Sequence, residues 1–237
     1  MRNSKNLLKM ITLSMLIALG VVISPILRVE GMCPMAHFIN IVCSVFLGPW
    51  YSLLCATLIG IIRMLTMGIP PIALTGAVFG AFLSGVFYRL SKGRILFAVL
   101  GEIIGTGIIG AIMSYPVMTF LWGKEGLSWL FYVPSFICGT LIGGSIAYVF
   151  LRKFAANGML AKIQNLLGSK GYTDHSSLLS NTLTIAALGG ILFVVFELAA
   201  EIFQLTGLLW DKMSYVSLAV CGAAAILYYI TKKVKAN

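Results

Sequence analysis

Long apolar runs, broken by short polar or proline-containing stretches, dominate the chain. Divided at charges, prolines and polar clusters, they give eight candidate segments: 8–27, 35–49, 50–67, 72–91, 95–121, 130–152, 178–206 and 213–231. A helix needs about 20 mostly apolar residues to cross the roughly 30 Å hydrocarbon core of a bilayer. The pattern therefore predicts an all-α polytopic membrane protein with about eight spans.

One polar stretch and two proline-containing breaks organise these segments. Gly48-Pro49-Trp50 separates two short runs and predicts a tight corner between helices, because proline is tolerated in the first turn of a helix and resists continuation of the preceding one. The long polar stretch begins near residue 155. We therefore predict a six-span body over 1–154, a cytoplasmic linker with one short amphipathic helix over 155–177, and a two-span extension over 178–237.

Composition agrees with a membrane protein. Hydrophobic residues make up 59% of the 237 residues and charged residues 10%, with a mean hydropathy of +1.00. A soluble domain is roughly 25% charged, so the chain has no room for a large soluble domain. The five cysteines are odd in number, form no C-x-x-C pair and lie mostly in apolar runs, which favours packing over disulfide or metal chemistry. We expect no cofactor and no metal.

The formal net charge of +10 raises the question of nucleic-acid binding, and the positions of the basic residues answer it. With the N-terminus inside, thirteen of the 17 Lys and Arg residues fall on the cytoplasmic side. The other four are Arg28, Arg63, Lys124 and Lys212. Basic residues accumulate in cytoplasmic loops. The charge therefore indicates a plasma-membrane protein with both termini cytoplasmic, and it gives no reason to expect a nucleic-acid partner.

Ionisable residues inside a span are costly, and they usually face the protein interior or a cavity. Glu102 and Thr106 stand four apart and share one helix face, beside the small residues Gly101 and Gly105. This face can bind a ligand or another helix, and the spacing alone does not decide between them.

A second polar group lies at the outer end of the second candidate segment, 35–49. His37 and Asn40 are three apart on one face, and each can be either a ligand contact or a satisfied interior group. A metal site is not expected, because Cys33 with His37 is too small a ligand set. Arg63 lies near the same outer side, where its stem can either snorkel to the interface or face the same ligand.

Aromatic and small residues add two further candidates. Tyr115 and Trp129 lie at the outer edge of the fifth and sixth segments, as an interfacial belt or as the walls of an outward-facing pocket. Ser14 and Ala18 are four apart and form a flat surface on the first segment, for packing within the protein or against another helix.

The extension carries its own acidic pair. Glu197 and Glu201 are four apart, and they can bind a cation, pair with Lys212 or be solvated at a cavity mouth.

Enzyme signatures are absent from the sequence: there is no H-E-x-x-H, no G-x-S-x-G and no Walker A lysine. We expect no enzymatic activity, and any ATP-driven step would need a separate subunit.

Three stretches resemble one known family. They are "CPMAHFINIVCSVFLGPWYSLL", "GAVFGAFLSGVFYRL" and "LGEIIGTGIIGAIMSYPV", in that order, and the similarity covers about residues 10 to 154. The sequence resembles ThiW, the substrate-binding S-component of an energy-coupling-factor transporter for the thiamin precursor hydroxyethylthiazole.

The resemblance implies a six-helix S-component whose pocket opens outward. A transmembrane T-component and two cytoplasmic ATPases would supply energy, and the loaded S-component would topple to release its cargo inside. By analogy, the Ser14 and Ala18 face would dock the T-component, and residues 28–34 would form a lid over the ligand. Glu102 would accept the cargo hydroxyl or, if protonated, donate to the ring.

Two other functions stay open at this stage. One is a solitary proton- or cation-coupled carrier, in which Glu102, Glu197 or Glu201 takes the coupling proton. The other is a structural membrane subunit without a ligand, in which the polar faces only join helices.

Overall fold

The computed structural model describes residues 2–25, 32–172 and 208–234, with scattered residues between 178 and 196. The chain divides into two compact units, Met1–Asp174 and His175–Asn237. Every regular element in the described part of the chain is a helix, and no strand occurs there. The predicted all-α class is confirmed for these residues.

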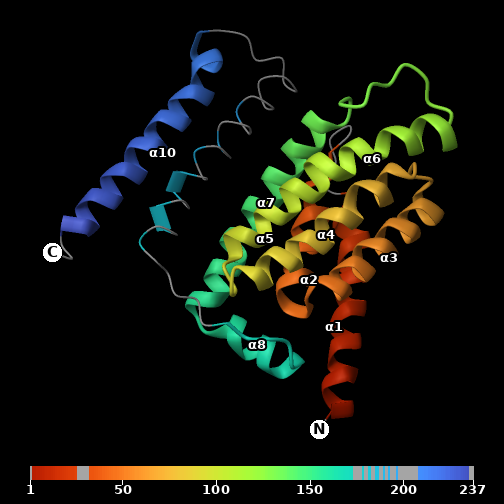
Figure 1. Cartoon of the computed structure of the whole chain (residues 1–237), viewed down its shortest axis with the longest axis horizontal. Coiled ribbons are helices and arrows are strands. Elements are labelled where there is room, and N and C mark those ends of the chain that lie inside the picture. The colour runs from red at the N-terminus through yellow and green to blue at the C-terminus, as the bar shows by residue number, and fades with distance from the viewer. Residues whose placement is uncertain are drawn as a thin grey trace. The chain divides into compact units, whose positions relative to one another are not determined.

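The first unit is a bundle of helices, labelled in Figure 1. Its elements are α1 (Arg2–Ile23), α2 (Pro34–Leu47), α3 (Pro49–Met67), α4 (Ile72–Leu90), α5 (Ile95–Glu102), η1 (Ile103–Gly110), α6 (Ala111–Pro116), η2 (Val117–Leu121), α7 (Val133–Ala156) and α8 (Met159–Leu167). The run from α5 to η2 is one continuous helix of 27 residues, in which η1 and η2 have the wider π-helical turn.

Six described helical segments are long and apolar enough to cross a membrane. They are Asn3–Ile23, Pro49–Met67, Ile72–Leu90, Ile95–Leu121, Val133–Ala156 and Tyr215–Val234. Helix α2 has only 14 residues and buries all but two of them, so it is a core helix of the bundle. The predicted segment 178–206 lies mostly outside the described residues, and the count of eight spans stays a prediction.

The predicted corner between α2 and α3 is present. Gly48 has φ 95°, a conformation that L side chains rarely adopt, and a Cβ there would overlap the guanidinium of Arg89. Pro49 begins α3. Helix α4 packs closely on this corner, because a Cβ on Gly85 would lie 2.5 Å from Pro49 Cα. The glycine and proline therefore allow two helices to join with almost no loop.

Helix α4 also packs closely against the long fifth span. A Cβ on Gly101 would lie 2.5 Å from the carbonyl oxygen of Leu83, and one on Gly105 would lie 2.5 Å from Gly80 Cα. Small residues let two membrane helices approach at backbone distance. This packing holds the residues between Gly101 and Gly105 against α4, which positions the site described below.

Helix α8 covers one end of the bundle, near the N-terminal end of α1 (Figure 1). Gln164 is fully buried, and its amide donates to the carbonyl oxygen of Val45 at 2.9 Å and to the Tyr88 hydroxyl at 3.0 Å. Leu160 and Leu167 join the hydrophobic core. The short amphipathic helix predicted between 155 and 177 is therefore found, and it is part of the first compact unit.

The second unit contains α10 (Leu208–Val234) and scattered helical residues before it. Within this unit, the Asn181 amide donates to the Tyr228 hydroxyl at 3.3 Å. Lys212 is exposed. Glu197 and Glu201 lie outside the described residues, so their predicted roles stay predictions.

Candidate functional site

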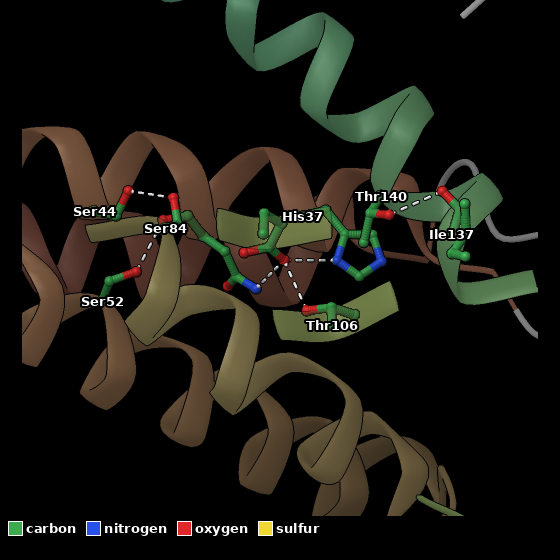
Figure 2. A network of polar contacts seen from close by, with 9 residues as sticks. His37, Ser44, Ser52, Ser84, Thr106, Ile137 and Thr140 are labelled. Carbon is green, nitrogen blue, oxygen red and sulfur yellow. Dashed lines mark hydrogen bonds and ion pairs between the residues drawn. The ribbon is translucent and has the colours of Figure 1, made fainter. Parts of the chain in front are cut away.

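The side chain of Glu102 is the centre of a buried polar network (Figure 2). Its Oε1 lies 2.9 Å from His37 Nδ1 and accepts hydrogen bonds from Asn40 Nδ2 at 3.0 Å and Thr106 Oγ at 3.1 Å. The four side chains come from α2, the end of α5 and η1. The helix faces predicted from the His37–Asn40 and Glu102–Thr106 spacings thus meet at one carboxylate oxygen.

Hydrogen bonding assigns the donors in this network. Glu102 is fully buried, and a buried carboxylate needs donors to offset the loss of solvation. Asn40 and Thr106 supply N–H and O–H groups, and His37 supplies a third donor when Nδ1 carries the ring proton. In the neutral imidazole this leaves Nε2 as an acceptor. Figure 2 shows the second ring nitrogen of His37 pointing away from the network.

The second carboxylate oxygen of Glu102, Oε2, takes no part in this hydrogen-bond network. Oε2 is buried and has no hydrogen-bond partner in the described part of the chain. It lies against Gly80 of α4, where a Cβ would be 2.9 Å away. Glycine at this position therefore leaves just enough space for the carboxylate, and a buried polar atom stays unsatisfied next to it.

Further hydrogen bonds fix α2 against its neighbours. The Ser52 hydroxyl donates to the backbone carbonyl of Asn40 at 2.9 Å, and the hydroxyls of Ser44 and Ser84 lie 2.8 Å apart (Figure 2). These contacts join α2 to α3 and α4. They hold the side chains of α2 in register with the carboxylate from the fifth span.

A cavity of about 90 Å³ lies beside the network. Its walls come from α2, α3, α4, η1 and α7, and from the residues that flank α2 and α4. The lining residues are Met32, Cys33, Ala36, His37, Arg63, Ile69, Ile72, Ala73, Gly76, Ala77, Thr106 and Phe136. The walls are mainly apolar, with a few convergent polar groups, as is typical of small-molecule sites.

Glu102 and Asn40 do not line the cavity. His37 and Thr106 do, and both are hydrogen-bonded to Glu102. The geometry makes Glu102 a positioning residue, which acts on the cavity through its two neighbours. A direct contact between Glu102 and cargo, which the resemblance suggested, is not the contact that this arrangement favours.

Arg63 lines the cavity from α3, with only 4% of its surface exposed. Its Nε is buried and has no hydrogen-bond partner within the described residues. Snorkelling, the simpler alternative for this residue, requires the guanidinium to reach the interface. The side chain is buried at the cavity instead.

The structure does not bring Tyr115 or Trp129 to the cavity. Their rings contact each other, with centroids 4.5 Å apart, and Trp129 is 55% exposed. The aromatic wall is Phe136 of α7, which the sequence did not single out. A Cβ on Gly76 would lie 2.6 Å from the Phe136 ring, so the ring rests on the glycine face of α4. The four-residue spacing of Gly76 and Gly80 was the available signal for this wall.

The remaining predicted residues, Ser14 and Ala18, are exposed on α1. Their spacing of four residues places these two exposed side chains on one face of α1. As for metals, no cluster of three or more His, Cys, Asp or Glu side chains able to hold an ion occurs among the described residues.

A bundle of membrane-length helices around a small, mainly apolar cavity, with ionisable groups buried beside it, defines a membrane protein that handles a small molecule. The chain belongs to the ThiW family: the family model described as "Thiamine-precursor transporter protein (ThiW)" matches residues 10–157, more than half of the 237 residues. This is a family of transporters and not of enzymes, and the chain is a multi-pass membrane protein. Searches of curated proteins and of solved structures found no match.

The matched region contains every residue of the cavity and of the Glu102 network. It ends before α8, so α8 and the second unit lie outside it. The candidate site therefore lies wholly within the part of the chain that the family model matches.

Proposed function

We propose that this protein is the substrate-binding membrane subunit of an energy-coupling-factor transporter, and that it imports hydroxyethylthiazole or a closely related small heteroaromatic. The observation that carries the proposal is the cavity beside the Glu102 network, which lies wholly within the family-matched region. Its size, one aromatic wall and three polar groups suit a single small ring.

The chemistry of hydroxyethylthiazole matches these groups. The ring packs on Phe136, its nitrogen accepts from the Arg63 guanidinium, and its hydroxyl donates to His37 Nε2. The Thr106 hydroxyl donates to Glu102, and its oxygen is a second acceptor near His37 Nε2 for the single hydroxyl proton of the cargo. His37 Nδ1–H and the Thr106 hydroxyl both donate to Glu102. This leaves His37 Nε2 and the Thr106 oxygen as hydrogen-bond acceptors at the cavity.

Energy and release would come from partners. A T-component and two ATPases would bind and hydrolyse ATP, since the sequence has no Walker A lysine. The exposed Ser14 and Ala18 face of α1 would dock the T-component. With both termini cytoplasmic, the cavity would lie toward the outer side. The predicted lid, residues 28–34, lies mostly outside the described residues and stays a prediction. Residues 1–154 form the binding body, 155–177 a connection, and 178–237 an accessory two-span extension.

A binding titration tests this function. Purified full-length protein is titrated with hydroxyethylthiazole by isothermal calorimetry, and Thr106→Ala is compared with Thr66→Ala. Both threonines donate one hydrogen bond, but the exposed Thr66 bonds only within α3. Since one hydrogen bond contributes about 0.5–1.5 kcal/mol, Thr106→Ala weakens binding by up to about tenfold and Thr66→Ala leaves it unchanged. Absence of binding by the wild type contradicts the proposal.

A second function has one specific observation in its favour. Glu102 Oε2 is buried and has no hydrogen-bond partner among the described residues, which makes it a candidate position for a coupling proton in a solitary carrier. Liposomes that hold only this protein distinguish the two functions. Accumulation of thiazole driven by an imposed proton gradient, without any ATPase, favours the carrier, and absence of such accumulation favours the binding subunit.

A further inference from the structure

We infer that Arg63 recognises an anionic group, and that the cavity therefore prefers a carboxylate-bearing form of its heteroaromatic cargo over the neutral alcohol. This inference rests on the proposed function, because it concerns the same cavity. Its basis is the guanidinium of Arg63, which has no charged partner among the described residues.

The first step is the burial of Arg63. Its side chain lines the cavity at 4% exposure, and its Nε has no hydrogen-bond partner among the described residues. An arginine stays charged at all relevant pH values. A buried and unpaired charge is strongly unfavourable, so an acceptor is expected to meet it when the site is occupied.

The second step is the position of the acidic residues. Within the described part of the first unit these are Glu102 and Glu125. Glu102 accepts hydrogen bonds from His37, Asn40 and Thr106 and does not line the cavity, and its second oxygen lies against Gly80. Glu125 is exposed. Among the described residues, no ion pair joins either carboxylate to Arg63, which leaves a bound cargo as a source of the missing negative charge.

The third step is the match between donor and acceptor. A guanidinium presents five N–H groups in a planar fork, and a carboxylate accepts two of them in parallel. A thiazole nitrogen accepts only one hydrogen bond and carries no charge. A phosphate would bring more charge and more acceptor oxygens than one arginine in a cavity of about 90 Å³ can satisfy. A monoanionic carboxylate is therefore the class that fits.

Two matched compounds test the inference on the purified full-length protein. One is hydroxyethylthiazole, and the other is the thiazole acetate in which a carboxylate replaces the terminal hydroxymethyl group. Calorimetry is expected to show at least tenfold tighter binding of the acetate. Arg63→Gln is expected to weaken the acetate far more than the alcohol and so to remove the preference, because both compounds lose the guanidinium donor but only the acetate loses a charged partner. Arg63→Lys retains part of the preference, because the charge remains without the fork.

A further variant distinguishes a carboxylate of the cargo from one of the chain. Glu30 lies outside the described residues, two positions before the cavity-lining Met32. Glu30→Gln is expected to keep the preference for the acid. Acid binding that appears only in Glu30→Gln contradicts the inference, because the chain would then have supplied the negative charge itself.

The remaining outcomes separate this inference from the proposed function. Equal or tighter binding of the alcohol by wild type, or a preference that persists in Arg63→Gln, overturns the inference while thiazole binding stands.

If neither thiazole binds, the proposed function fails, and phenylacetate with phenylethanol then tests the charge alone. A preference for phenylacetate that Arg63→Gln abolishes supports anion recognition, and no preference contradicts it. If Arg63→Gln does not fold, the wild-type ratio decides.

Discussion

Glu102 Oε1 and His37 Nδ1 lie 2.9 Å apart, although 65 positions separate the two residues in the chain. This contact joins α2 to the fifth span in the interior of the bundle. It also links the carboxylate, which cannot reach the cavity, to an imidazole that lines it. We therefore propose that Glu102 sets the hydrogen-bonding state of His37 and Thr106 at the cavity.

The first prediction concerns the charge of this carboxylate. Glu102→Gln keeps the shape but replaces a charged acceptor by a neutral one, and hydrogen bonds to charged groups are worth about 1.5–3 kcal/mol against about 1 for neutral ones. We expect thiazole binding to weaken at least fivefold and the free energy of unfolding to fall by about 1–2 kcal/mol. Calorimetry and thermal unfolding in detergent measure the two effects. Unchanged affinity would show that the charge of Glu102 does not position the site.

The second prediction concerns the close approach of α4. A Cβ in Gly80→Ala would overlap Thr106 Oγ and lie 2.9 Å from Glu102 Oε2. We expect loss of binding and destabilisation of about 1–3 kcal/mol from overpacking, measured by the same assays. Gly222→Ala in α10 is the matched control, because a Cβ there meets nothing within 4 Å. Equal effects of the two substitutions would argue against a special role for the glycine at position 80.

The third prediction separates stability from binding. Gln164→Ala removes the donor to Val45 and Tyr88 that attaches α8 to the bundle. Loss of these bonds costs about 1–3 kcal/mol, so α8 becomes more accessible to protease and to hydrogen exchange. Thiazole affinity stays within twofold of wild type, because α8 is not part of the cavity. Asn165→Ala, an exposed neighbour, should change neither readout.

The fourth prediction tests the docking face. Ala18→Trp places a large ring on the exposed small-residue face of α1, whereas Val220→Trp places one on an exposed position of α10. Co-purification with a T-component and its ATPases is expected to be lost in the first variant and kept in the second. Thiazole binding is expected to persist in both. Retention of the complex by Ala18→Trp would place the docking surface elsewhere.

Much of this arrangement followed from spacing along the chain. Apolar runs predicted the six helices of the body, the Gly48-Pro49 break predicted the corner, and three- and four-residue spacings placed His37 with Asn40 and Glu102 with Thr106 on common faces. Spacing does not say which helices are neighbours. The meeting of both faces at one oxygen depends on the glycine packing of α4, and it could only be found in three dimensions.

The aromatic wall shows why the rest could not be predicted. Tyr115 comes after the π-helical stretch Ile103–Gly110, and wider turns rotate all later residues relative to a regular helix. The sequence placed Tyr115 only by its depth at the outer edge of the fifth segment, and the period of 3.6 residues could not have given its face. Trp129 lies on the loop before α7 and contacts Tyr115 instead of the cavity. Phe136 fills the wall because it faces Gly76, a pairing of two distant segments.

A structure of the protein with bound thiazole would show which residues hold the cargo. We expect density for one small ring against Phe136, within hydrogen-bonding distance of His37 Nε2 and the Arg63 guanidinium, with Glu102 hydrogen-bonded to His37 and not to the ligand. A ring bound outside this cavity, or one that contacts neither His37 nor Arg63, would contradict it.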